Sequence, residues 1–232
     1  MPIVILCQGG QSRLRGKIAT RKQLLEVNGE PILARTIRLC REGIGNALTP
    51  IVVGWPDFPP EYKAVVNPNP GHCILEGIRW SLDYFGPSAI WVFLLGDVVF
   101  SRESVYRILG SAMYQEDRPQ FFAVTKGDLG RGSGEVFAFV THGNCLHETK
   151  AALDTVDCIG AHASCEKYQP GHLRELLWTL MRMRNLVPDK RPAEYHSSLV
   201  LEIDDWTTDI DTTEDVERLG ELGDFARAEE ER

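Results

Sequence analysis

Residues 2–16 read PIVILCQGGQSRLRG, in which an apolar run passes directly into a glycine-containing loop. The run 2–7 predicts a strand, and Gly9 and Gly10 predict a loop whose backbone N–H groups can approach an anion because no Cβ obstructs them. A second apolar run, 89–95, ends at Gly96-Asp97 and predicts a central strand buried on both faces. Because open α/β sheets bind ligands at the carboxyl ends of their strands, both strand ends are candidates for one site.

Strand and helix patterns alternate along the rest of the chain. The spacing predicts further strands over 51–53, 64–66, 120–125, 135–140 and 198–203, and helices over 31–45, 73–85, 101–115, 173–183 and 212–222. This alternation predicts an α/β fold, with a single three-layer α/β/α domain and a mostly parallel mixed sheet over residues 1–222. Residues 223–232 are predicted to be an acidic C-terminal tail, and its end, residues 228–232, is expected to be frayed and solvated.

Composition narrows the class of protein. A chain of 232 residues with 43% hydrophobic residues is not disordered as a whole, and a net charge of −8 argues against a nucleic-acid partner. No apolar run approaches the ~20 residues that span a bilayer, and the N-terminus lacks the basic lead-in of a signal peptide. The 6 cysteines form no CxxC pair, which favours reduced thiols. We therefore expect a cytoplasmic protein without a membrane partner.

Three short motifs near the N-terminus carry a resemblance to a known family. They are LCQGGQSR at 6–13, RKQLL at 21–25 and NGEPIL at 28–33. In this order they resemble the signature of the sugar-phosphate and alditol-phosphate nucleotidyltransferases, and they are also similar to the molybdenum cofactor nucleotidyltransferase-like proteins. The resemblance implies a nucleotide-diphospho-sugar transferase (GT-A-like) fold. It also implies transfer of a nucleoside monophosphate from an NTP to a small phosphorylated acceptor, with release of pyrophosphate.

The same resemblance implies the residues of a nucleotide site. Arg13 and Lys22 would be catalytic, because they would stabilise the triphosphate and its pyrophosphate leaving group. The nucleotide-binding residues would be Leu6, Gln8, Gly9, Gly10, Arg13, Lys22, Asn67, Cys73 and Gly77. Gln8, Gln11 and Arg21 depart from the family pattern, which leaves open whether specificity is altered or activity lost. Arg21 suits phosphate binding and equally suits a solvated loop charge.

Two acidic positions far apart in the chain match the metal-binding positions of that family. Asp97 follows the strand 89–95, and Asp211 stands in DIDTTED at 209–215. Mg²⁺ prefers carboxylates together with phosphate oxygens and water. The resemblance therefore implies Mg²⁺ held by Asp97 and Asp211, with Asp209 as the less favoured choice. Because Asp211 precedes an acidic helix start, a role as helix N-cap is the alternative.

The acceptor has weaker candidates. Lys126, Arg131, Glu135 and Asp209 are expected to face it, since basic turn residues can hold a phosphate, although an exposed turn has the same composition. The partners implied are an NTP and a small phosphorylated substrate, and a homo-oligomer is compatible with the resemblance. Cys158, His162, Cys165 and His172 could form a zinc set, but their spacing is not that of a usual finger and favours buried thiols and surface imidazoles.

Two other functions fit the same fold. A GT-A-type glycosyltransferase would consume a nucleotide-sugar and would not require the pair Arg13 and Lys22, which is matched to a triphosphate. A non-catalytic nucleotide-sensing module would bind nucleotide without releasing pyrophosphate, and the departures at Gln8, Gln11 and Arg21 motivate it.

Overall fold

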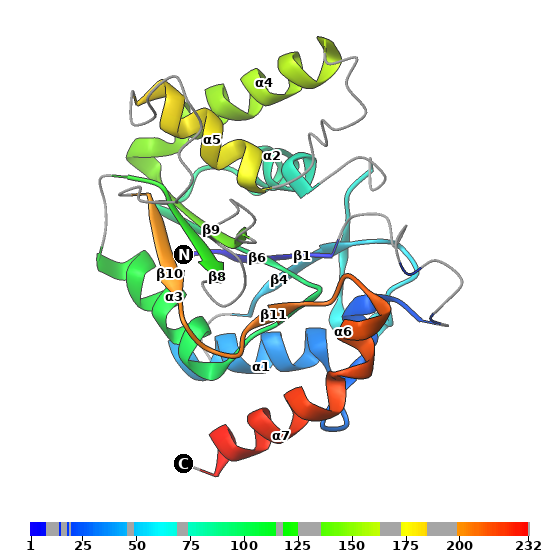
Figure 1. Ribbon diagram of the computed structural model, residues 1–232. Helices are drawn as coiled ribbons and strands as arrows, with labels where there is room; N and C mark the ends of the chain where they lie inside the picture. The colour runs from blue at the N-terminus through cyan, green and yellow to red at the C-terminus, as the bar shows by residue number, and fades with distance from the viewer. Residues whose placement is uncertain are drawn as a thin grey trace.

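The protein is seen here as a computed structural model, whose arrangement Figure 1 shows. The structure describes residues 1–7, 14, 18, 20–45, 49–68, 74–114, 118–124, 136–162, 173–184 and 199–231, and of 157–162 it describes the backbone. Within this part of the chain, a seven-stranded sheet has the order β10-β8-β9-β6-β1-β4-β5. Its strands are β1 (Ile3–Leu6), β4 (Ile51–Gly54), β5 (Val65–Val66), β6 (Ile90–Leu95), β8 (Gln120–Val124), β9 (Val136–His142) and β10 (Val200–Ile203).

Strand pairing confirms the predicted mostly parallel mixed sheet. β1 lies parallel to β4 on one side and to β6 on the other, and β10 lies parallel to β8. β9 is antiparallel to both of its neighbours, β6 and β8. The chain passes from β1 to β4 on one side of β1 and returns to β6 on the other side. The ends of these strands therefore form the topological switch point at which open α/β sheets bind ligands.

Helices cover both faces of the sheet, as Figure 1 shows. α1 (Ile32–Ile44) and α3 (Arg102–Tyr114) pack together on one face, while α2 (Ile74–Tyr84), α4 (Leu146–His162) and α5 (Leu173–Met183) cover the other. The α/β/α prediction is therefore confirmed. α1 ends at Ile44, and Gly45 follows it with φ of 76° and ψ of 159°, a region that is essentially restricted to glycine. None of the helices in the described ranges is long and apolar enough to cross a membrane.

The main core is built on aromatic rings of the central strands. Trp91 and Phe93 of β6 stack with ring centroids 5.8 Å apart, and Phe93 stacks in turn on Phe139 of β9 at 6.0 Å. All three side chains are fully buried. Rings of this size bury large apolar areas, and offset stacking adds to the gain from burial. This ladder makes the middle of the sheet a rigid base for the strand ends.

A second, smaller core lies beside the first, between short strands and the end of the chain. It joins the hairpin of β2 (Glu26–Val27) and β3 (Glu30–Pro31) to α7 (Leu219–Glu230). The hairpin turns through Asn28 and Gly29, which have φ of 55° and 77° as a two-residue turn requires. The buried members of this core are Leu14, Val27, Ile32, Val99, Ile210, Leu222 and Ala226.

The acidic end of the chain is helical through Glu230, so the fraying expected from residue 228 onward does not occur at 228–230. The helix predicted over 212–222 divides into α6 (Thr213–Glu217) and α7, and α7 continues through Glu230. Arg35 of α1, which is buried, donates to Glu229 and Glu230 at 3.1 Å each. A charge as deeply buried as Arg35 needs such partners, so the acidic end of the chain is ordered by it.

Gly96, directly after β6, packs tightly against the end of β1. Its N–H donates to the carbonyl of Leu6 at 2.9 Å. A Cβ at this position would lie against the sulfur of Cys7 and 3.1 Å from the carbonyl oxygen of Leu6. The position of Asp97, one residue further on, beside the end of β1 therefore depends on a residue without a side chain.

We expect Gly96→Ala to lower the free energy of unfolding by about 1–3 kcal/mol, the usual cost of overpacking a buried site. Gly110→Ala is the matched control, because a Cβ there meets nothing within 4 Å and lies inside α3. It should be neutral or stabilising by about 0.5–1 kcal/mol. Urea unfolding of both variants measures the difference, and equal midpoints would contradict the packing argument.

Glu229 is expected to stabilise the fold more than its neighbour Glu231. Besides pairing with Arg35, its carboxylate accepts from the backbone N–H of Arg102 at 2.9 Å and so caps α3. Glu229→Ala should cost about 2 kcal/mol, because a cap and one partner of a buried charge are lost together. Glu231→Ala should change stability by no more than about 0.5 kcal/mol, as exposed positions usually do. Thermal unfolding would contradict the argument if both variants melted alike.

Candidate active site

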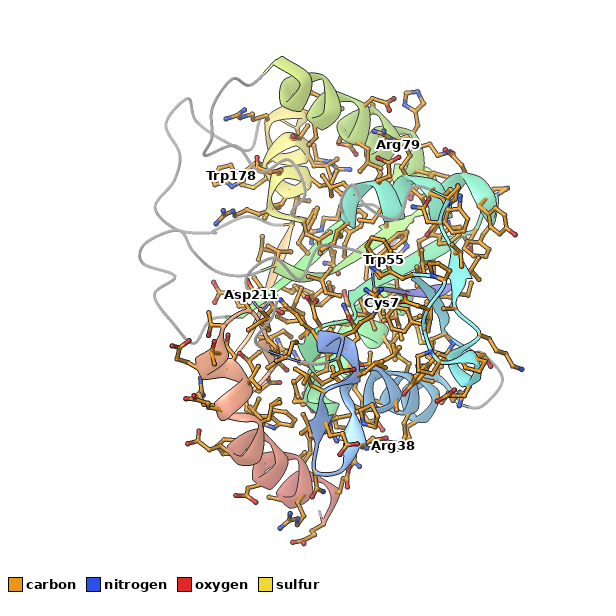
Figure 2. The ribbon with its side chains drawn as sticks, turned by 90° about the vertical axis from the view of Figure 1, so that its right-hand side faces the viewer. Cys7, Arg38, Trp55, Arg79, Trp178 and Asp211 are labelled. Carbon is orange, nitrogen blue, oxygen red and sulfur yellow. The ribbon has the colours of Figure 1, made fainter. Side chains whose placement is uncertain are left out.

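The candidate site lies at the carboxyl ends of β1 and β6. Asp97 follows β6 directly after Gly96, and the short 3-10 helix η1 (Lys22–Leu24) brings Lys22 to the same place. Leu6 is buried at the end of β1, and Asn67, also buried, follows β5 two strands away. Gly77 lies buried in α2. Figure 2 shows Asp211, Cys7 and Trp55 around this edge.

A two-stranded ribbon joins the late acidic segment to Asp97. β7 (Val98–Val99) pairs antiparallel with β11 (Thr208–Asp209), so that Asp209 lies opposite Val98. The N–H of Ile210 donates to the carbonyl of Asp97 at 3.2 Å. Residues on either side of this ribbon are therefore held within a few ångströms, although a hundred residues separate them in the chain.

Side-chain hydrogen bonds fix the far end of the ribbon. The backbone N–H of Ser101 donates to Oγ1 of Thr207 at 3.0 Å, and Oγ of Ser101 donates to Asp205 at 2.5 Å. Asp205 also accepts from the N–H of Thr207 at 2.7 Å. Oγ of Ser101 additionally accepts from the N–H of Ser104 at 2.9 Å, so Ser101 is the N-cap of α3.

The ribbon gathers three carboxylates. One oxygen each of Asp97, Asp209 and Asp211 lies within 4.8 Å of the others, and all three residues are half-buried. Hard oxygen donors at this spacing suit Mg²⁺, which usually binds proteins through one or two carboxylates and leaves room for phosphate oxygens. The donor set therefore fits the divalent ion that the motifs predict.

Lys22 lies between two of these carboxylates. Its Nζ donates to Oδ1 of Asp211 at 2.5 Å and lies 3.6 Å from Oδ2 of Asp97. The lysine side chain is only 6% exposed, whereas those of Asp97 and Asp211 are 23% and 24% exposed. The structure thus joins Lys22 of the early motif to both predicted metal ligands.

The N-cap of α6 is Thr212, not Asp211. The N–H of Asp215 donates to Oγ1 of Thr212 at 3.3 Å, and the carboxylate of Asp215 accepts from the N–H of Thr212 at 2.7 Å. This reciprocal capping box satisfies the start of the helix. The backbone N–H of Asp211 also donates to the Asp215 carboxylate, at 3.0 Å. The side chain of Asp211 takes no part in the capping box and accepts from Lys22. Of the two roles open to Asp211, the capping role is therefore excluded.

Arg21 is not a solvated loop charge. Its Nη2 donates to both oxygens of Asp57 at 2.6 and 2.7 Å, and its guanidinium lies over the rings of Trp55 and Phe58 at 5.1 and 5.5 Å. The hydrogen bond from Arg21 lowers the pKa of the Asp57 carboxyl. These contacts anchor the residue next to Lys22 to the loop after β4, a role that the motif comparison did not predict.

Cys7 and Gln23 pack beside Gly96, the residue before Asp97. Burial raises the pKa of the Cys7 thiol well above its ordinary value, and the nearby Asp97 carboxylate raises it further. Gln23 is also buried, and among the described residues its Oε1 has no hydrogen-bond partner. The two buried side chains beside Gly96 are therefore uncharged.

Several predicted site residues lie outside the described ranges. These are Gln8, Gly9, Gly10, Gln11, Arg13, Cys73, Lys126, Arg131 and Glu135, together with Cys165 and His172 and the side chains of Cys158 and His162. The residues that the structure brings together are Lys22, Asp97, Asp209 and Asp211. Asp209, predicted as an acceptor residue or a second-choice ligand, thus lies in the acidic cluster itself.

Comparison with known proteins assigns the family. Residues 3–205 match the family model described as the MobA-like NTP transferase domain. The match covers well over half of the chain, so the chain belongs to this family. It is therefore a nucleotidyltransferase, and the resemblance in the motifs is confirmed. No curated protein matched the chain in sequence.

Solved structures match over almost the whole chain. A putative glucose-1-phosphate thymidylyltransferase from Bacillus anthracis has a TM-score of 0.63 and 14% identity, covering 98% of this chain and 95% of its own. An inositol-1-phosphate CTP transferase from T. maritima has a TM-score of 0.59 and 13% identity, and the match covers 97% of this chain and 96% of that one. A hypothetical transferase from Thermus thermophilus has a TM-score of 0.56 and 14% identity, and the match covers 93% of this chain and 99% of that one. These similarities confirm the expected fold.

Cys7 and Cys40 are expected to be unreactive in the native protein. Both are fully buried, and burial raises the pKa of Cys40 to about 12. Since the thiolate is the nucleophile, iodoacetamide at pH 8 should leave both unmodified and label them only in urea. Peptide mass spectrometry reads the two states. Labelling of Cys7 at the same rate with and without urea would contradict its packing against Gly96.

Proposed function

We propose that this chain transfers a nucleoside monophosphate from an NTP to a small phosphorylated acceptor, releasing pyrophosphate in a reaction that requires Mg²⁺. The observation that carries the proposal is the cluster of Lys22 with Asp97 and Asp211 at the switch point of the sheet. A lysine from the early motif and carboxylates from two later segments meet there, in a family of NTP transferases. A triphosphate and a divalent ion need a cation and carboxylates in such an arrangement.

The chemistry asks the protein mainly for positioning and charge. An oxygen of the acceptor phosphate forms a bond to the α-phosphorus, the bond from that phosphorus to the bridging oxygen breaks, and pyrophosphate leaves with the electron pair. Asp97 and Asp211 would hold Mg²⁺, with Asp209 beside them, and the bound ion would neutralise phosphate charge. Lys22 would donate to a phosphate oxygen, and η1, which also carries Gln23, holds its backbone near Gly96.

The acceptor is proposed to be a phosphate monoester of a sugar or another alcohol. Two of the matching solved structures are named for transfer to glucose 1-phosphate and inositol 1-phosphate, and both cover almost all of this chain. Their names share one chemical feature, a phosphate carried on a polyol. This feature defines the first panel of acceptors to be tested. The NTP is identified by testing ATP, CTP, GTP, UTP and dTTP in turn.

Asp97→Asn and Asp211→Asn are expected to reduce turnover by about 10²-fold or more, the scale at which single charge-stabilising groups act. Pyrophosphate release is measured with ATP, CTP, GTP, UTP or dTTP, Mg²⁺, and glucose 1-phosphate or inositol 1-phosphate. Asp83→Asn is the matched control. Asp83 is an exposed carboxylate on α2 that pairs with Lys150, and its loss should leave turnover unchanged.

Three results would count against the proposal in different ways. Turnover of a nucleotide-sugar in place of every NTP would assign a glycosyltransferase. Binding of an NTP without pyrophosphate release, unaffected by Asp97→Asn, would assign a nucleotide-sensing module. Turnover that survives both aspartate substitutions would place the chemistry outside the acidic cluster.

A further inference from the structure

The contacts of Lys22 involve the same carboxylates that the proposed function assigns to the metal. Nζ lies 2.5 Å from Asp211 and 3.6 Å from Asp97, and these two aspartates would be the ligands of Mg²⁺. The three carboxylates of the cluster carry three negative charges, and the ammonium neutralises one. In the protein without metal, Lys22 therefore occupies part of the electrostatic role that the metal would have.

The burial of Lys22 restricts what can happen when a divalent ion arrives. An ammonium with 6% side-chain exposure is costly to leave without a partner, because desolvation has removed its water. A divalent ion on Asp97 and Asp211 would compete for their charge and repel a cation a few ångströms away. Lys22 must then exchange Asp211 for another anion, and the phosphates of the nucleotide are the anions that the reaction supplies.

We propose that Lys22 is the resident counter-ion of the acidic cluster and that a divalent ion displaces it from Asp211, which releases its ammonium toward the nucleotide phosphates. This inference rests on the proposed function, since it takes the cluster as the metal site. Lys22 would then have two successive partners, first Asp211 and then a nucleotide phosphate. Metal binding and the readiness of Lys22 to hold phosphate are thereby coupled through one side chain.

Mn²⁺ binding without nucleotide tests the displacement directly. Its affinity is measured by electron paramagnetic resonance of the free ion for wild type and for Lys22→Met. The variant should bind Mn²⁺ about tenfold more tightly or better, because a competing cation at contact distance is gone. Lys22→Arg keeps the charge and should remain near wild type. Lys150→Met, at a lysine paired with Asp83 on the surface, is the matched control and should change nothing.

A second readout uses the wild-type protein and does not depend on how a variant folds. Brief labelling with an amine-reactive ester, quantified by peptide mass spectrometry, should modify Lys22 faster when Mn²⁺ is present, because its ammonium has left Asp211. Lys63, which is exposed, is the internal reference and should be labelled at one rate throughout.

The outcomes separate this inference from the proposed function. Tighter Mn²⁺ binding by Lys22→Met together with faster labelling of Lys22 supports the displacement. Equal affinity of wild type and Lys22→Met, lost in Asp211→Asn, overturns the displacement and leaves the metal site in place. Absence of Mn²⁺ binding in wild type and in Lys22→Met overturns the displacement, and the proposed function falls with it only if pyrophosphate release from every NTP is absent as well.

Discussion

Repulsion among three carboxylates is the constraint around which this end of the molecule is built. Asp97, Asp209 and Asp211 lie within 4.8 Å of one another, so the chain must hold them against their own charge. The β7–β11 ribbon does so through its backbone pairing, and Ser101, which lies 106 residues before Thr207, ties its far end. Lys22 offsets one of the charges. Each of these ties is intramolecular and independent of ligand, which preorganises the carboxylates for a divalent ion.

The C-terminal helix α7 shows how an acidic stretch of sequence becomes ordered. Glu229 and Glu230 look solvated in the sequence, because acidic residues at a chain end usually are. Two arginines of α1 change the outcome: Arg35 is buried and Arg38 pairs with Glu230 at 2.7 Å. The last turn of α7 is thereby held, although acidic residues oppose the helix dipole there. The earlier turns of α7 contribute Leu222 and Ala226 to the second core.

The fold was predictable because its signals are local. The buried runs that form β1 and β6 and the helical spacing of α1 can be recognised without knowing what they pack against. The β7–β11 ribbon could not be predicted, because strands of two residues carry no periodicity and their pairing is set by distant segments. The β2–β3 hairpin did have a signal, the Asn28-Gly29 pair. Asp97 and Asp211 were found through motifs, whereas the contact of Lys22 with both depends on three-dimensional folding.

The match to the family model ends at residue 205, just before the ribbon strand that carries Asp209. Two of the three clustered carboxylates therefore belong to a segment outside the matched part, yet they meet Asp97 and Lys22 within it. The segment reaches this place by packing: Ile210 and α7 enter the second core together with Val99 and Val27. The hairpin that carries Val27 follows η1 directly. One small core thus supports the lysine from the start of the chain and the aspartates from its end, which makes α7 part of the architecture of the site.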